Sequence, residues 1–203
     1  MKITLDWLKK NRACIEGVEW FSNHVEKSAI KEPELEIVIN ALLEEDHSQW
    51  ANWTLVRFLD RKQKIQYAVF AAEQVIDIFE KKYPNDKRPR KAIEAAKKCL
   101  GNDTKEDRAS AYAAAYAAYA YAASAAAYAA SAAAYAAYAA AYAAYAAAYA
   151  AYAYDAAAAY AAYAAAYAAA AYAASSSAAA SAKKKMREKI LKYGLSLLKG
   201  EGL

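Results

Sequence analysis

The side chains best suited to catalysis or metal binding are few in this sequence and lie far apart. The two histidines, His24 and His47, have no second histidine or cysteine at the spacing of zinc ligands. Phosphate-binding loops of the GxxxxGKS, GxxxxGKT and GxGxxG types are absent, and so is a nucleophile elbow. Glu44, Glu45 and Asp46 form an acidic run of the kind that usually lies on a solvated surface. We therefore expect no enzyme activity, no cofactor and no metal site.

The two cysteines, Cys14 and Cys99, form neither a CxxC motif nor a disulfide framework. Both fall in helical patterns, where a cysteine usually behaves as a small apolar residue, so we predict a packing role for both. The N-terminal residues 1–7 lack the uninterrupted apolar run of a signal peptide. These features lead us to expect a cytoplasmic location.

Tyrosine gives the sequence its most distinctive chemistry. Residues 109–182 contain only Ala, Tyr, Ser and one Asp. A seven-residue recurrence, with a second position three residues later, places the tyrosines of this tract on one helical stripe. We predict that the stripe is a partner-binding surface made by Tyr128, Tyr135, Tyr138, Tyr142, Tyr145, Tyr149 and Tyr152. Two alternatives stay open: the stripe is a buried seam between helices, or the tract is a passive spacer lengthened by repeat slippage.

The tract itself is predicted to be helical, because alanine is the best helix former and no Gly or Pro occurs between Lys105 and Tyr193. Asn102, Asp103 and Thr104 supply an N-cap, with Asp107 at the capping-box position. One straight helix over its 74 residues would be about 110 Å long. We therefore expect residues 102–182 to form a long helical hairpin or a coiled coil, the latter within one chain or in a homo-oligomer. Turn-forming positions are expected near Asp155 and at the serines 175–177.

Residues 1–101 have ordinary globular composition and are predicted to form a head of four or five helices. The expected starts are Thr4, Pro33 in a first turn, and the region of Asp46 and Ser48. A stripe at helical spacing predicts one helix ending near Tyr83, with Ile65, Val69, Ala72, Ile76 and Phe79 buried. Pro89 is expected to open a helix over 89–100 that Gly101 closes.

No strand pattern is present, so the predicted fold class is all-α. Trp50 and Trp53 lie three positions apart and share a helix face, where they form either an aromatic ligand platform or part of the core.

The net charge of +5 is concentrated in residues 183–203, which hold seven basic and two acidic residues. There Met186, Ile190, Tyr193 and Leu197 recur at helical spacing, which predicts a short basic amphipathic helix. Such a helix closes the bundle, lies on a membrane surface, or covers an acidic partner. The tyrosine-rich tract is too polar for a transmembrane span, so we expect no stable insertion in a membrane.

One segment, residues 83–96 with the sequence YPNDKRPRKAIEAA, resembles the YP-x-D-x-RPR-x-AIEAA pattern of an immunity protein family with relatives in phage and mobile-element genomes. In that family an alanine-rich helical repeat follows the pattern, and the resemblance covers about residues 46–150. Its distinctive part here is Asp86, Arg88, Pro89 and Arg90. The resemblance implies a helical protein that antagonises something by binding.

We therefore expect a non-enzymatic interaction protein, of the immunity or anti-defence type, that binds and blocks a protein partner. The alternative is a small-ligand binder such as a nucleotide-signal sponge, in which tyrosines stack on bases and Arg88, Arg90 or the basic tail hold phosphates. Arg88 and Arg90 could equally be surface charges at a helix N-terminus or tie two helices together.

Overall fold

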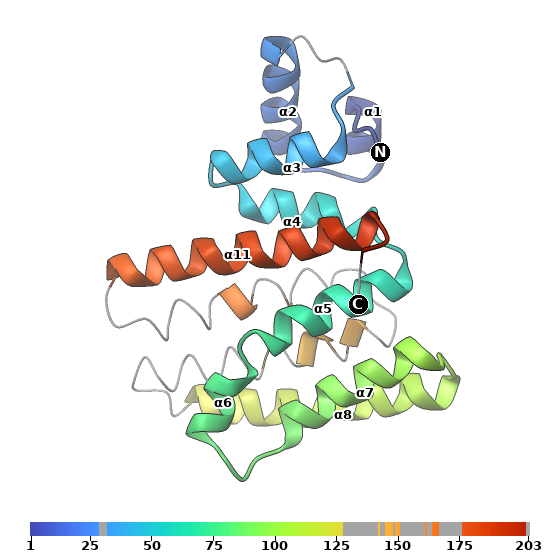
Figure 1. The fold of residues 1–203 in the computed structure, drawn as a ribbon, viewed down its shortest axis with the longest axis vertical. Helices are drawn as coiled ribbons and strands as arrows, with labels where there is room; N and C mark the ends of the chain where they lie inside the picture. Colours follow the sequence, from blue (N-terminus) through green and yellow to red (C-terminus); the bar gives the residue numbers. More distant parts are fainter. Residues whose placement is uncertain are drawn as a thin grey trace. The chain divides into compact units, whose positions relative to one another are not determined.

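The computed structural model describes residues 1–28, 32–127, 142, 145–147, 149–150, 161, 164–166 and 176–201. Within these ranges the chain is helical, and the one extended feature is an isolated antiparallel bridge between Lys2 and Glu34 (Figure 1). The predicted all-α class is confirmed. The expected hairpin or coiled coil of residues 102–182 falls largely outside the described residues.

The chain divides into two compact units, Met1–Leu55 and Val56–Leu203. The division lies inside the segment 1–101 that we expected to be a single head. The first unit holds α1 (Leu5–Lys10), α2 (Ile15–Ser28), α3 (Leu35–Glu44) and nearly all of α4 (Ser48–Val56). The second holds α5 (Arg61–Glu73), α6 (Ile76–Lys82), α7 (Arg88–Gly101), α8 (Lys105–Ala127) and α11 (Ser176–Leu198).

The first unit begins as the sequence predicts. The Thr4 hydroxyl accepts a hydrogen bond from the Trp7 N–H at 3.1 Å and caps α1. Pro33 was expected in the first turn of the next helix, but α3 starts only at Leu35, with Glu34 at its N-cap. The Pro33 carbonyl instead accepts the Ile3 N–H at 3.0 Å, an extended pairing that ties the N-terminus to the start of α3.

The core of this unit consists of residues from all four helices and the N-terminal segment. Its buried members include Ile3, Leu8, Phe21, Leu35, Val38, Ile39, Leu42, Ala51 and Leu55. Short helices of 6 to 14 residues are marginal alone, so this shared apolar face stabilises them.

In the second unit the stripe predicted from Ile65 to Phe79 is buried as expected, but it lies on two helices rather than one. Val75 has φ −130° and its N–H bonds the carbonyl of Ala72, three residues back. This tighter turn ends α5, and both Val75 and Ile76 are buried. The spacing of four and three residues from Ala72 to Ile76 and Phe79 continues across the break, which is why the spacing alone missed it.

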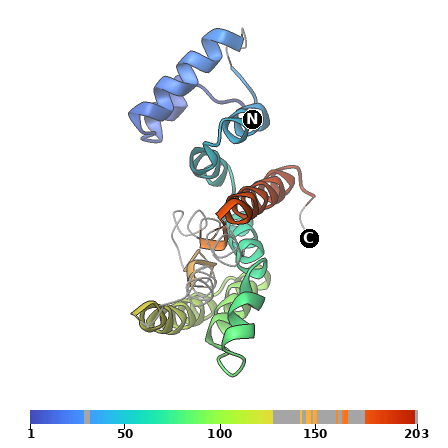
Figure 2. The same cartoon turned by 90° about the vertical axis from the view of Figure 1, so that its left-hand side faces the viewer.

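Helices α7 and α8 lie side by side in both views and are joined by residues 102–104 (Figures 1 and 2). The predicted cap is confirmed: the Thr104 hydroxyl accepts the Asp107 N–H at 3.0 Å and donates to the Asp107 carboxylate at 2.8 Å. Gly101 was expected just beyond α7, but it is the last helical residue, and Asn102 caps the helix with extended backbone.

Helix α11 packs against α5, which agrees with the first of the three alternatives for the C-terminal helix, that it closes the bundle. It begins at Ser176, within the serine run where we expected a turn, and so extends upstream of the predicted start at 183. Ile190, Leu191, Leu195 and Leu197 are buried, and the Gln63 side-chain amide donates to the Leu197 carbonyl at 2.9 Å. Its apolar face is therefore already covered within the protein.

Candidate functional site

Three groups of side chains bear on function: tyrosines of the tract, ion-paired arginines, and a cavity walled by tryptophans. Of the seven tyrosines predicted as a partner surface, the structure describes Tyr142, Tyr145 and Tyr149, while Tyr128, Tyr135, Tyr138 and Tyr152 lie outside the described residues. The three are half-buried, and their rings contact each other in sequence, with centroids 5.4 Å and 5.5 Å apart.

Alanine, rather than tyrosine, is the buried residue wherever the tract is described. On α8, Ala111, Ala115 and Ala118 are fully buried at helical spacing. On the same helix, Tyr112 and Tyr116 are 40% and 63% exposed. Small alanine side chains let helices approach closely, so α8 packs through its alanines and turns these two phenol rings toward solvent.

The tract also brings distant tyrosines together. The Tyr149 ring lies 6.1 Å from the Tyr112 ring of α8, although the two residues are 37 positions apart in the sequence. On one straight helix that separation would be about 55 Å. Tyr112 and Tyr149 therefore do not lie on one straight helix, and Tyr149 of the predicted stripe contacts another helical segment, α8.

The two arginines of the family-like segment are both paired with carboxylates. Arg88 donates to Asp86 from its Nε at 3.0 Å and its Nη2 at 2.6 Å, and its backbone N–H donates to the same carboxylate. The Arg90 Nε and Nη2 donate to the two oxygens of Glu80, at 3.0 Å and 2.6 Å. These hydrogen bonds lower the pKa of Asp86 and of Glu80 below their ordinary values.

Arg90 thus ties α7 to α6, which agrees with the structural alternative considered for it. Arg88 closes the loop before α7. A phosphate would have to compete with a carboxylate for either guanidinium, so the geometry does not favour these residues as a phosphate site.

A second ionic cluster, which the sequence did not single out, joins three segments of the second unit. Asp103, between α7 and α8, accepts hydrogen bonds from Arg61 of α5 and from Arg108 of α8, each at 2.9 Å from the Nε. The hydrogen bond from Arg61 is the main cause that lowers the pKa of Asp103 to about 2. This cluster fixes the turn between the paired helices.

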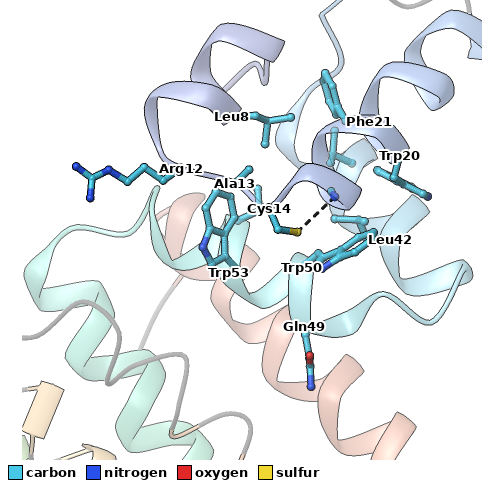
Figure 3. A pocket seen from close by; sticks show the side chains of 13 residues that line it. Leu8, Arg12, Ala13, Cys14, Trp20, Phe21, Leu42, Gln49, Trp50 and Trp53 are labelled. Atoms are coloured by element: carbon cyan, nitrogen blue, oxygen red, sulfur yellow. Dashed lines mark hydrogen bonds between the residues drawn. The ribbon is translucent and has the colours of Figure 1, made fainter.

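The first unit contains a cavity of about 360 Å³, which we call the tryptophan cavity. Its floor consists of the buried residues Leu8, Phe21, Val38, Leu42 and Thr54. Its walls consist of the half-buried Ala13, Gly17, Trp20, Trp50 and Trp53, and its exposed rim of Arg12, Cys14 and Gln49 (Figure 3). Two of the walls come from Trp50 and Trp53 of α4, as the ligand-platform alternative required.

Histidine rings support two of the tryptophan walls. His24 stacks on Trp20 with ring centroids 4.8 Å apart, and His47 stacks on Trp50 at 4.2 Å. The Trp20 indole N–H also donates to the Glu45 carboxylate at 2.6 Å. Each stacked imidazole covers one face of its indole, so only the other face or the edge of that ring can contact the cavity.

Cys14 lies at the rim, where the structure contradicts its predicted packing role. It precedes α2, is exposed, and its Sγ accepts the Gly17 N–H at 3.4 Å, drawn in Figure 3. The thiol caps the first turn of α2 and is therefore not part of the apolar core. The prediction is confirmed for Cys99, which is buried; burial raises the pKa of that thiol.

Sequence reasoning missed the contribution of α2 to this cavity. Trp20 and the small residues Ala13 and Gly17 had no spacing that linked them to α4. The usable signal was Gly17 inside a helical pattern, since an interior glycine often marks a close approach of a bulky neighbour. A Cβ on Gly17 would lie 3.2 Å from the Cys14 Sγ and 4.0 Å from the Trp50 ring.

Within the described residues, no three or more His, Cys, Asp or Glu side chains cluster as metal ligands would. None of the described helices combines the length and the hydropathy that a membrane span needs. Comparison of the chain with family models, curated proteins and solved structures finds no match.

Proposed function

We propose that this protein is a non-enzymatic interaction protein that binds and blocks a protein partner, with the tyrosine-bearing tract as its contact surface. The observation that carries the proposal is the difference in burial along α8, where three alanines are buried and Tyr112 and Tyr116 are exposed. Tyrosine provides a large contact area at low cost in side-chain entropy, which is why binding surfaces favour it.

The partner surface is broader than the stripe first predicted. It begins with Tyr112 and Tyr116 and continues to the half-buried Tyr149, which contacts Tyr112. The remaining stripe tyrosines, arranged as a helical hairpin or coiled coil within the chain or between two copies, would extend the same surface. The buried alanines make that surface rigid, which reduces the entropy lost on binding.

The blocking role rests on the resemblance of residues 83–96 to the immunity protein family. In this structure the same segment supplies the loop and the first turns of α7, which packs against α8. The family-like segment therefore supports the helix that presents Tyr112 and Tyr116. A cytoplasmic location belongs to the same proposal.

The test is a paired capture experiment with the full chain. Tyr112→Ala with Tyr116→Ala should leave the helical content nearly unchanged and lower the melting temperature only modestly, because the two side chains are 40% and 63% exposed. The double variant should abolish capture of a specific protein from host extract. The captured protein is then purified, and its activity is measured with and without the chain.

The matched control is Ile15→Ala with Ile37→Ala, which removes two apolar side chains that are 75% and 46% exposed in the first unit. This control should capture and block as the unchanged chain does. If the tyrosine variant captures and blocks equally well, the tract is a spacer and the proposal is wrong.

The alternative, a nucleotide-signal sponge, receives less support because Arg88 and Arg90 already bind carboxylates. It predicts heat release when nucleotides are titrated into the chain, and a loss of that heat in Arg88→Gln with Arg90→Gln. The interaction proposal predicts no nucleotide binding.

A further inference from the structure

We propose that the tryptophan cavity is a binding site for a small, planar aromatic molecule of one or two fused rings that carries one hydrogen-bonding group. The cavity lies wholly within residues 1–55, far in sequence from the tyrosine tract, and this proposal is independent of the partner surface. Its volume of about 360 Å³ is within the range of ligand pockets and suits a compact ligand.

The shape of the ligand follows from the walls. Three indole rings, Trp20, Trp50 and Trp53, line one small space, and a flat ligand can stack on such rings or meet their edges. Trp20 and Trp50 are held by stacked histidines, and Trp53 meets Trp7 edge-on, at 6.1 Å and 80°. Each of the three indole rings is therefore held by a neighbouring ring in the absence of a ligand. Such preorganisation favours tight binding of a rigid ligand.

The polarity of the ligand follows from the floor. Four of the five floor residues are apolar, and the fifth, Thr54, is only 3% exposed. The Thr54 hydroxyl is the one polar side-chain group on this floor, and it can donate or accept a hydrogen bond. A single hydroxyl, amine or carbonyl on the ligand would complement it.

The charge of the ligand is set by the rim. Arg12 is the one charged residue in the lining, and its side chain points away from the cavity in Figure 3. With no carboxylate and no inward cation in the lining, an ionised ligand would lose its hydration without gaining a partner. The site therefore selects neutral ligands.

The probe is 2-naphthol, titrated by calorimetry into the full chain, with decahydro-2-naphthol as the saturated comparator of similar size and the same hydroxyl. We expect one site, with 2-naphthol bound at least about tenfold more tightly, because stacked and edge-on contacts between aromatic rings add affinity beyond the burial of apolar area. Thr54→Val should weaken 2-naphthol several-fold. Binding of 2-naphthol in the tryptophan cavity should also slow the alkylation of Cys14 at the rim.

The blocking variant is Gly17→Leu, whose side chain enters the cavity between Cys14 and Trp50. Gly101→Leu is the matched control, because nothing lies within 4 Å of its Cβ position. Trp50→Leu and Tyr116→Leu form a second pair, the first inside the lining and the second at an exposed ring of α8 in the second unit. Gly17→Leu should abolish binding and Trp50→Leu should weaken it about tenfold, while both controls bind normally.

Circular dichroism of each variant shows whether it is folded before it is titrated, and the Trp50 pair keeps the test decisive if Gly17→Leu unfolds. The proposal is overturned if 2-naphthol does not bind, if it binds no more tightly than decahydro-2-naphthol, or if a folded Gly17→Leu chain binds it unchanged.

Discussion

The ring of Tyr193 stacks on the ring of Phe70, with centroids 3.9 Å apart and planes inclined by 16°. Phe70 belongs to α5 and Tyr193 to α11, so the contact joins two helices separated in sequence by the whole alanine–tyrosine tract. Burial raises the pKa of the Tyr193 hydroxyl, as expected for a phenol held against an apolar neighbour. The C-terminal helix is thus a structural part of the second unit.

Tyr193→Ala should lower the stability of the second unit by about 1–3 kcal/mol, less than a fully buried aromatic because the ring is half-buried. Thermal unfolding followed by circular dichroism measures the change. Lys192→Ala, an exposed neighbour on the same helix, should have little effect. Equal melting temperatures for Tyr193→Ala and the unchanged chain would contradict this role for α11.

Ala115→Leu should destabilise the packing of α8 by about 1–3 kcal/mol, because Ala115 is fully buried and a larger side chain overpacks its surroundings. Ala117→Leu, two positions on and exposed, should be neutral. Urea unfolding of the two variants makes the comparison. Equal stability of both would mean that alanine is not the packing residue of this helix.

Asp103→Asn should make stability less dependent on acid. The pKa of Asp103 is about 2 in the folded chain against an ordinary 3.8, so its ionised form favours folding above about pH 4. That contribution is lost as the pH falls toward 2. The stability difference between the unchanged chain and the variant should therefore be largest above pH 4 and shrink as the pH falls through 2.

The difference should be about 1 kcal/mol or less, since exposed ion pairs contribute little. Melting temperatures measured from pH 7 to pH 2 test it. Arg61→Gln with Arg108→Gln removes the partners and should flatten the acid dependence in the same way. A stability difference that stays constant between pH 4 and pH 2 would count against the Asp103 cluster.

The two cysteines should differ sharply in alkylation. Cys14 is exposed and should react with iodoacetamide at once in the folded chain, whereas Cys99 is 4% exposed and should react only on unfolding. Mass spectrometry of peptides after brief labelling distinguishes the sites. Labelling of Cys99 as fast as Cys14 without denaturant would contradict the burial of α7.

Features with a local cause could be predicted from the sequence. The caps at Thr4 and Thr104 depend on residues three positions away, and both form as predicted. The apolar stripe from Ile65 to Phe79 was also found, because helical spacing records which face is buried. The break at Val75 was missed, since it depends on what the two adjacent side chains meet in the folded unit.

In the candidate sites, too, local features could be predicted from the sequence and contacts between distant segments could not. The shared face of Trp50 and Trp53 was predicted, but its meeting with Trp20 was not, because no pattern links positions 20 and 50. Likewise, Arg90 was noted for its type, while its partner Glu80 lies on another helix. The heptad pattern left open whether the tyrosines are exposed or form a buried seam, and on α8 the alanines are the buried residues.

The division between Leu55 and Val56 also separates the aromatic chromophores of the chain. All four tryptophans lie before it, and all 19 tyrosines lie after it. Tryptophan emission therefore reports on the first unit, and the tyrosine bands of the second-derivative absorbance spectrum report on the second, without any label. A single denaturant titration can follow both spectra, and two separate midpoints would establish that the units unfold independently.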